Sequence, residues 1–126
     1  MAIVAGGSAL VLAACGSTSG GGGGGSSCNP TGGSTSGTGT TAVKVVPDPN
    51  TVGKFDPTTV SVTAGQTVEW DFTDSSTPHT VTADDNSFDS CSQNAGFTFL
   101  VTFSKAGDVK YHCTLHAQML GTVKVS

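Results

Sequence analysis

The feature that most constrains the fold is an alternation of apolar and polar residues that starts near Thr41 and continues to the C-terminus. A period of two places successive side chains on opposite faces of a half-buried strand. The alternating segments are 43–46, 60–62, 68–72, 97–103, 109–113 and 123–125. Gly, Pro and Asp separate many of these segments, and no stretch has a convincing helical period. The pattern predicts an all-β sandwich of short strands, with Trp70 and the Phe residues in its core.

The first 40 residues lack this alternation and divide into two parts. Residues 2–14 form an apolar run that ends in the sequence Leu-Ala-Ala-Cys-Gly. The run is too short to span a bilayer, which needs about 20 apolar residues, but its length suits the hydrophobic region of a signal peptide. Residues 16–40 are almost entirely Gly, Ser and Thr. Such a composition cannot bury enough apolar surface to fold, and it predicts a disordered tether.

The end of the apolar run resembles the lipobox of bacterial lipoproteins, in which a Cys is acylated and becomes the first residue of the mature protein. The resemblance implies a signal peptide over 1–14, a lipidated Cys15 that opens a flexible linker over 15–40, and a folded domain over 41–126. It also implies an exported protein, anchored by lipid to the bacterial membrane and facing the periplasm or the cell exterior. The alternative is a buried apolar strand with an incidental Cys.

The charge of the chain excludes one class of partner. Five Lys, no Arg and nine acidic residues give a net charge of −4. No basic stripe could neutralise a row of phosphates, so nucleic acid is not an expected partner. Anionic lipid is excluded as an electrostatic partner on the same ground.

Two short segments carry the residue types of a metal site. One contains Pro78-His79, and the other has the spacing Cys-x-x-His-x-x-Met over Cys113, His116 and Met119. A thiolate, two imidazoles and a weak thioether favour copper in a trigonal site with a long axial bond. Cys113 would end a strand on its inward face, and the tight loop after it would bring His116 and Met119 to the same metal. A structural zinc site is the alternative, although zinc gains little from a thioether.

On these residues the chain resembles the cupredoxins, the family of plastocyanin, pseudoazurin and amicyanin. The two-residue gap between His116 and Met119 is similar to the short amicyanin form, and the Pro before His79 and the final Gly-x-Val-x-Val also match. The resemblance implies a Greek-key sandwich that holds one copper ion, cycling between Cu(I) and Cu(II). It implies that His79, Cys113 and His116 are equatorial ligands and that Met119 is axial.

The sequence departs from this family at two positions near the ligands. Thr80 stands where the family commonly has an Asn that ties the ligand loops together, so we expect it to do this less well or differently. Leu115 stands where the family commonly has Pro. Because Leu115 has an N–H, we hypothesise that it donates a second hydrogen bond to the Cys113 sulfur and raises the reduction potential. His112 alternates with Cys113 and is expected on the surface.

Two cysteines remain once Cys15 is assigned to lipid and Cys113 to copper. Thiols of exported proteins usually pair, which predicts a disulfide between Cys28 and Cys91. The alternative is two free or intermolecular thiols, because Cys28 lies in flexible sequence.

The expected function is one-electron transfer by a monomer that meets redox partner proteins. The resemblance implies that His116 presents a ring edge to partners, and Leu115, Ala117 and Leu120 could form an apolar rim around it. Asp84, Asp85 and Asp89 could steer a basic partner or simply be a solvated loop. The alternative is copper capture, buffering or delivery at the cell surface. An enzyme is not expected, because the chain has three His in all and two are assigned to this site.

Overall fold

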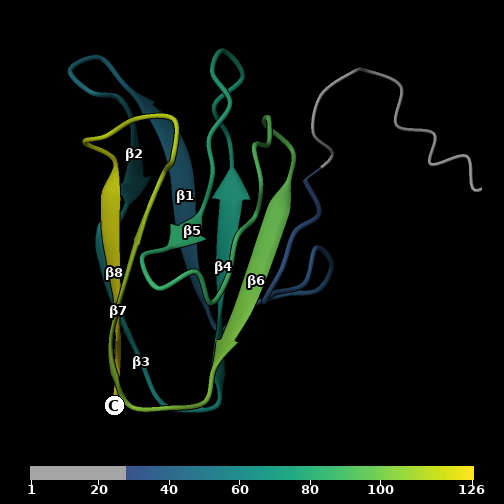
Figure 1. Ribbon diagram of the computed structural model, residues 1–126, viewed down its shortest axis with the longest axis vertical. Helices are drawn as coiled ribbons and strands as arrows, with labels where there is room; N and C mark the ends of the chain where they lie inside the picture. Colours follow the sequence, from purple (N-terminus) through teal and green to yellow (C-terminus); the bar gives the residue numbers. More distant parts are fainter. Residues whose placement is uncertain (1–27) are drawn as a thin grey trace, which may run out of the picture.

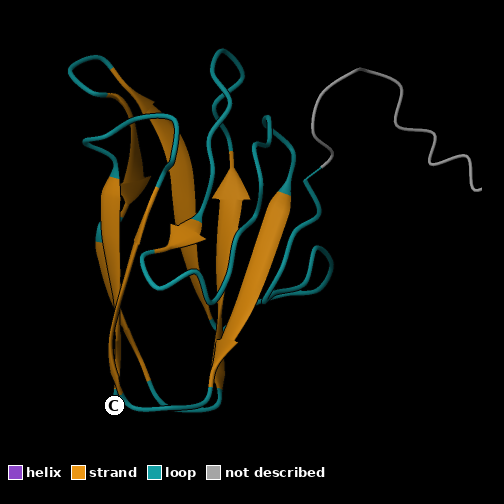
Figure 2. Ribbon diagram, in the orientation of Figure 1, coloured by secondary structure: helices purple, strands orange, loops and turns teal. Residues whose placement is uncertain are grey.

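The computed structural model describes residues 28–126, which form eight β-strands and no helix (Figures 1 and 2). The strands are β1 (Thr41–Asp48), β2 (Val52–Asp56), β3 (Thr59–Val62), β4 (Gln66–Phe72), β5 (Thr82–Ala83), β6 (Thr98–Phe103), β7 (Gly107–His112) and β8 (Leu120–Val125). The prediction of an all-β fold is confirmed. The predicted signal peptide, Cys15 and the linker as far as residue 27 lie outside the described residues. Within 28–126 no helix has the length and apolarity needed to cross a membrane.

Two four-stranded sheets enclose the core. The strand order is β2-β1-β4-β6 in one sheet and β3-β8-β7-β5 in the other. The β1–β4 and β3–β8 pairs are parallel, and the other neighbouring strands are antiparallel. The chain passes from one sheet to the other at every connection from β2 to β7. The result is the predicted Greek-key sandwich.

Trp70 of β4 lies in the core between the sheets and is fully buried. Its ring centroid is 5.2 Å from that of Tyr111 on β7 in the opposite sheet, and 6.4 Å from those of Phe99 and Phe103 on neighbouring β6. Aromatic pairs at such distances add about 0.5–1.5 kcal/mol each beyond the burial of their surfaces. Trp70 therefore couples the two sheets through direct ring contacts.

Two strands, β2 and β5, have no counterpart in the sequence prediction. The inward positions of β2 are Gly53 and Phe55, and a glycine contributes no apolar side chain to the alternation. Only two residues make up β5, which is too short to give a periodic signal. The partner of β5 is β7, which is distant in the sequence, and the local pattern does not encode this pairing.

Residues 28–40, here called the strap, lie alongside β6 although their composition assigns them to the flexible linker. Ser34 and Leu100 exchange both backbone hydrogen bonds, at 2.7 and 2.8 Å, and Thr31 and Asp89 do the same at 2.9 and 3.0 Å. The alternation places Leu100 on a polar face, yet it is 5% exposed because the strap covers it. The part of the predicted linker within the described residues therefore packs against the domain.

A disulfide joins Cys28 at the start of the strap to Cys91, and their Cα atoms are 5.8 Å apart. This is the pairing expected for the two cysteines left over in the sequence. The bond ties the strap to the long connection between β5 and β6. Among the described residues Cys113 is the free cysteine, and it is buried.

The double variant with Cys28→Ser and Cys91→Ser should lose about 2–4 kcal/mol of unfolding free energy, because cross-linking residues 63 positions apart restricts the unfolded chain. Urea titration of the metal-free protein, with and without a reductant, measures the change. The reductant should destabilise the wild type and leave the double variant unaffected. Equal midpoints for the two oxidised proteins would contradict the prediction.

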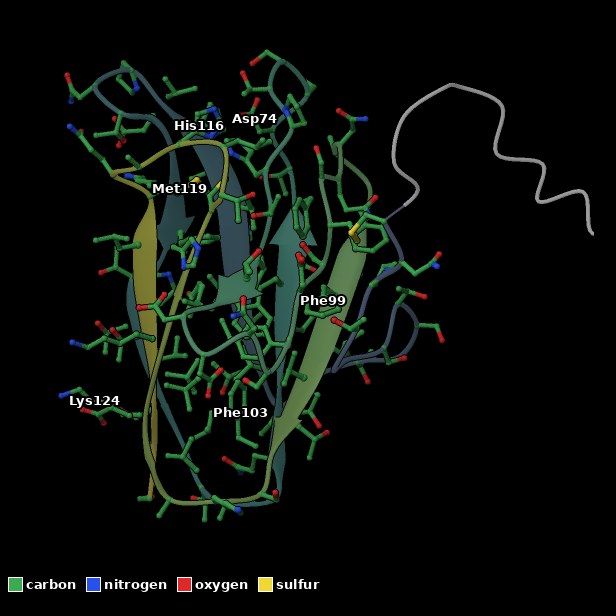
Figure 3. The ribbon with its side chains drawn as sticks, in the orientation of Figure 1. Asp74, Phe99, Phe103, His116, Met119 and Lys124 are labelled. Carbon is green, nitrogen blue, oxygen red and sulfur yellow. A yellow bond between two sulfur atoms is a disulfide. The ribbon has the colours of Figure 1, made fainter. Side chains whose placement is uncertain are left out.

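The connections that carry the predicted ligands lie at one end of the sandwich, away from the C-terminus (Figure 1, upper end). They are the β4–β5 connection and the β7–β8 loop, and the β1–β2 hairpin lies at the same end. Figure 3 labels Asp74, His116 and Met119 at this end. The sheets thus bring three segments that are distant in sequence to one place.

Candidate metal centre

Four predicted ligand side chains gather where these connections meet. Ligand atoms of His79, Cys113 and His116 lie within 4.8 Å of one another. His79 is 1% exposed, Cys113 2% and Met119 1%, whereas His116 is half-buried. Met119 lies in the same loop as His116, at the same end of the sandwich (Figure 3). The cluster is closed to solvent except at the His116 ring.

The loop after β7 is held tightly enough to place its ligands. The Cys113 N–H donates to the Met119 carbonyl at 3.0 Å, and the Met119 N–H donates to the His116 carbonyl at 3.0 Å. These bonds turn the chain back into β8 and leave His116 Nδ1 3.5 Å from the Cys113 sulfur. Two atoms about 2.0–2.3 Å from one metal ion lie about 3.5–3.8 Å apart at tetrahedral to trigonal angles. The spacing therefore suits two ligands of one ion.

The backbone of His79 is fixed by a single bridge to Gln93. The His79 N–H donates to the Gln93 carbonyl at 3.1 Å, and the Gln93 N–H donates to the His79 carbonyl at 2.9 Å. The sequence predicted a strand here, but β5 begins only at Thr82. The long β5–β6 connection thus takes the place of a neighbouring strand and positions the histidine.

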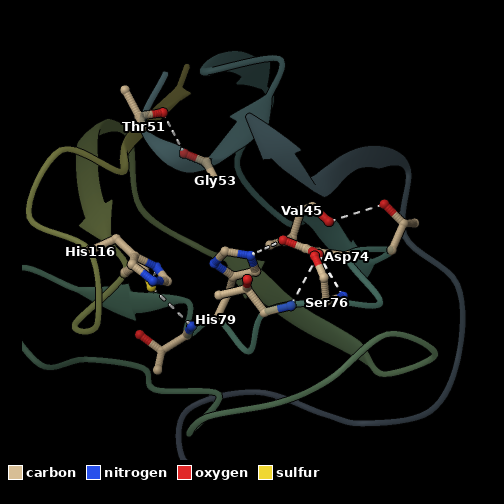
Figure 4. A network of polar contacts seen from close by, with 11 residues as sticks. Val45, Thr51, Gly53, Asp74, Ser76, His79 and His116 are labelled. Carbon is tan, nitrogen blue, oxygen red and sulfur yellow. Dashed lines mark hydrogen bonds and ion pairs between the residues drawn. The ribbon is translucent and has the colours of Figure 1, made fainter. Parts of the chain in front are cut away.

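The His79 ring is confined on two sides. Gly53 of β2 packs against it so closely that a Cβ at position 53 would lie 2.3 Å from the ring Cε1. On the other side, Nε2 is 2.7 Å from the Asp74 carboxylate (Figure 4). Burial would raise the pKa of Asp74, but hydrogen bonds from His79, Ser76 and Thr77 outweigh it and lower the pKa to about 2. The carboxylate is therefore ionised at neutral pH.

The other ring nitrogen of His79, Nδ1, is buried and has no hydrogen-bond partner among the described residues. Leaving a buried polar atom unsatisfied costs about 1–3 kcal/mol, so such atoms are uncommon in folded proteins. His79 belongs to the group that includes the Cys113 thiol and the second imidazole, and Figure 4 shows this second nitrogen on the side of the ring that faces His116. A thiolate, two imidazoles and a thioether fit copper, and a copper ion would give Nδ1 the partner it lacks. The residues present therefore fit the metal.

Thr80 joins the two ligand segments by its hydroxyl and by its backbone. The Thr114 N–H donates to Thr80 Oγ1 at 2.8 Å, and the Thr80 N–H donates to the Cys113 sulfur at 3.3 Å. The expectation that Thr80 ties the loops differently from an Asn agrees with these contacts. A hydrogen bond to the sulfur withdraws charge from the thiolate and so tunes the metal.

The hypothesis about Leu115 is wrong. In the described structure, the Cys113 sulfur has hydrogen-bond contacts with the Thr80 amide and with His116 Nδ1, and none with the Leu115 amide. Leu115 itself is 49% exposed. The expected contribution of the Leu115 amide to the reduction potential therefore loses its basis.

His112 and the acidic residues Asp84, Asp85 and Asp89 contribute no atom to the cluster of His79, Cys113 and His116. His112 Nδ1 lies 2.6 Å from an Asp84 carboxylate oxygen at a partly exposed position on the outer face of β7. Asp89 accepts hydrogen bonds from the Thr82 hydroxyl and the Cys91 N–H. Asp85 accepts one from the Ser87 N–H. The three aspartates each have a local structural partner, which favours the solvated-loop interpretation over a docking patch.

Two residues that shape the site, Gly53 and Asp74, were not predicted from the sequence. Gly53 lies on a strand that the alternation did not predict. Asp74 is five residues before His79 in a Ser/Thr-rich loop, and such loops commonly have an Asp that caps its own turn. A carboxylate shortly before a proposed metal-binding His was the one signal available, because ligating imidazoles usually donate their second N–H to such a group.

Fold and site together define a copper-binding β-sandwich, and comparison with known proteins places it in a family. Residues 41–126 match the family described as copper binding proteins, plastocyanin/azurin family, and the chain belongs to it. A purple cupredoxin from Nitrosopumilus maritimus is 26% identical, with 66% of this chain and 98% of that one covered and a TM-score of 0.55. Amicyanin from Paracoccus versutus is 28% identical, with 68% and 81% covered and a TM-score of 0.55. A reduced Cu(I) form of an amicyanin variant is 27% identical, with 68% and 82% covered and the same TM-score.

The family membership confirms two of the predictions. The fold is cupredoxin-like, and the cofactor is one copper ion, for which the required His, Cys, His and Met side chains are present. Proteins of this family are typically electron carriers rather than enzymes.

The Gly53→Ala variant should lower copper affinity at least about tenfold, which corresponds to about 1.4 kcal/mol. A methyl group 2.3 Å from the His79 ring would push the imidazole away from the other ligands. Competitive copper titration measures the affinity, and the neighbouring Val52→Ala change, at a 51% exposed position, is the control. Unchanged affinity in Gly53→Ala would show that the ring has room to move.

The Thr80→Val variant should lower the unfolding free energy of the metal-free protein by about 1–2 kcal/mol, because it leaves the Thr114 N–H without its acceptor. Thr80→Ser keeps the hydroxyl and is the matched control. Both variants keep the backbone bond to the Cys113 sulfur. Chemical denaturation compares them, and equal stability of the two variants would rule out a contribution from this hydrogen bond.

Proposed function

We propose that the protein transfers single electrons through a mononuclear type 1 copper site. The proposal rests mainly on His79 Nδ1, a buried ring nitrogen that finds no hydrogen-bond partner within residues 28–126, and on the cluster that His79 forms with a buried thiol and a second imidazole. His79, Cys113 and His116 would be the equatorial ligands, and Met119 the axial ligand. When bound, copper supplies the Cu(I)/Cu(II) couple.

The residues around the metal would contribute rigidity. His79 is held by Gln93, Gly53 and Asp74, and Cys113 is held by the start of β8 and by the Thr80 amide. A site whose ligands are fixed in both oxidation states rearranges little when an electron moves. Deep burial of His79, Cys113 and Met119 also excludes water, which favours fast electron exchange over exchange of the metal.

His116 would be the point of electron entry and exit. His116 is the half-buried member of the ligand group. It borders a surface hollow of about 310 Å³, which is also lined by Ala117, Gln118 and the hairpin residues 50–52. Leu115 and Leu120, with exposures of 49% and 59%, provide apolar surface next to it, and Val52 at 51% adds to this rim. A small apolar surface with few charges suits brief contact with a redox partner protein.

The N-terminal assignments are part of the same proposal. Residues 1–14 would be a lipoprotein signal peptide and Cys15 the lipidated residue, with the remainder of 15–40 linking it to the copper domain over 41–126. The protein would then work outside the cytoplasm as a membrane-anchored monomer. Family membership is consistent with such a location, since cupredoxins are generally extracytoplasmic.

The first experiment is a Cu(II) titration of the full chain in detergent, followed by optical and paramagnetic-resonance spectroscopy. One equivalent of copper should produce an intense thiolate-to-copper absorption band, and the band should be absent in Cys113→Ser. A colourless protein that retains zinc, or bound Cu(II) without this band, would refute the proposed site.

The same preparation separates electron transfer from copper handling. Reversible voltammetry together with slow transfer of copper to a chelator would support the carrier. Rapid release of copper to the chelator would instead favour capture, buffering or delivery of the metal.

A further inference from the structure

We infer that Asp74 is a positioning residue for the copper site: its carboxylate fixes the proton of His79 on Nε2, directs Nδ1 toward the metal and favours Cu(II) over Cu(I). The inference rests on the proposed function, because it assigns a role to a residue that touches a proposed ligand. Asp74 lies in the β4–β5 connection and contributes no atom to the ligand cluster itself.

The first observation is the direction of the contact between the two side chains. Asp74 Oδ2 lies 2.7 Å from His79 Nε2, and the side chains are 2% and 1% exposed. The other oxygen of this carboxylate already accepts three hydrogen bonds, and a carboxylate held in this way presents Oδ2 as an acceptor, so Nε2 is the donor. In a neutral imidazole the other nitrogen, Nδ1, then carries the lone pair. This is the buried nitrogen that has no partner among the described residues.

The second observation is that the carboxylate cannot easily rotate away. Its other oxygen, Oδ1, accepts hydrogen bonds from the Ser76 N–H at 2.9 Å, the Ser76 hydroxyl at 2.8 Å and the Thr77 N–H at 3.2 Å (Figure 4). These three bonds use one oxygen for the turn over residues 74–77 and leave Oδ2 for the histidine. The turn therefore holds the carboxylate in one orientation, with Oδ2 and its negative charge next to the ring.

The consequence for the metal follows from charge. The site carries one more positive charge with Cu(II) than with Cu(I), and a buried anion stabilises the more positive state more strongly. A carboxylate on the second nitrogen also increases the basicity of the ligating one. Both effects lower the reduction potential relative to a site with a neutral partner at this position.

The Asp74→Asn variant separates this role from a purely structural one. The three donors around Oδ1 require an acceptor there, so the side-chain oxygen of the Asn would take that place and its NH₂ group would face His79 Nε2. Two donors then oppose each other unless the ring proton moves to Nδ1, the nitrogen that the metal needs. The variant keeps the hydrogen bonds that hold the turn. If Asp74 only stabilised the turn, the variant would therefore leave the proton position on His79 and the reduction potential unchanged.

The test uses the full chain, as wild type, Asp74→Asn and the control Asp84→Asn. The control removes the same charge at an exposed carboxylate that contacts His112, the chain neighbour of Cys113. Nitrogen-15 NMR spectroscopy of the metal-free proteins reports which ring nitrogen of His79 carries the proton. Spectroelectrochemistry of the copper-loaded proteins reports the reduction potential.

We expect the proton on Nε2 in the wild type and on Nδ1 in Asp74→Asn. We also expect binding of Cu(II) relative to Cu(I) to weaken at least tenfold in Asp74→Asn, which raises the potential by about 59 mV for a one-electron couple. Asp84→Asn should match the wild type in both measurements.

Three results would overturn the inference. They are a wild-type proton on Nδ1, a potential and proton position in Asp74→Asn equal to the wild type, and an equal rise in potential in Asp84→Asn. The first needs no variant, so the test remains decisive even if Asp74→Asn fails to fold. A wild type without the thiolate-to-copper band would refute the proposed function instead, while the nitrogen spectra would still decide the position of the proton.

Discussion

The contact between Trp70 and Tyr111 joins the two sheets at the level from which the ligand connections leave them. Trp70 is two residues from the end of β4, which continues into the segment with His79, and Tyr111 is two residues before Cys113. A fixed separation of the two rings therefore fixes the separation of two ligand segments. The site is built on strand ends that the core holds at a set distance, which is how a small sandwich can position ligands from distant parts of its sequence.

The polar contacts around the ligands form a second layer that refines this placement. Thr80 links the two ligand segments. Gln93 exchanges backbone hydrogen bonds with His79, and the turn that begins at Asp74 limits rotation of the His79 ring. Each of these residues is held by main-chain hydrogen bonds. The ligand atoms therefore have little freedom even before a metal arrives, which lowers the entropy lost on binding.

The sequence predicted well those parts of the structure that local pattern encodes. The alternation through Trp70 and Phe99 located strands, and the spacing from Cys113 to Met119 located the ligand loop. The sequence could not predict β2, because its inward residue Gly53 contacts the ring of His79, 26 residues later in the chain, and leaves no room for an apolar side chain. It also misjudged the strap, whose Gly and Ser residues bury little by themselves and are held by Cys91 and by pairing with Leu100. Contacts between distant residues decided each of these cases.

The disulfide also determines how a mechanical force would enter the domain. A pull on the chain before Cys28 passes through the sulfur–sulfur bond to Cys91, and a single residue separates Cys91 from Gln93 and its bridge to His79. Without that bond, the same pull would peel the strap from β6 and reach β1 first. The covalent link shields the sheet from being unzipped at its N-terminal end, and it directs tension into the segment that supports a copper ligand.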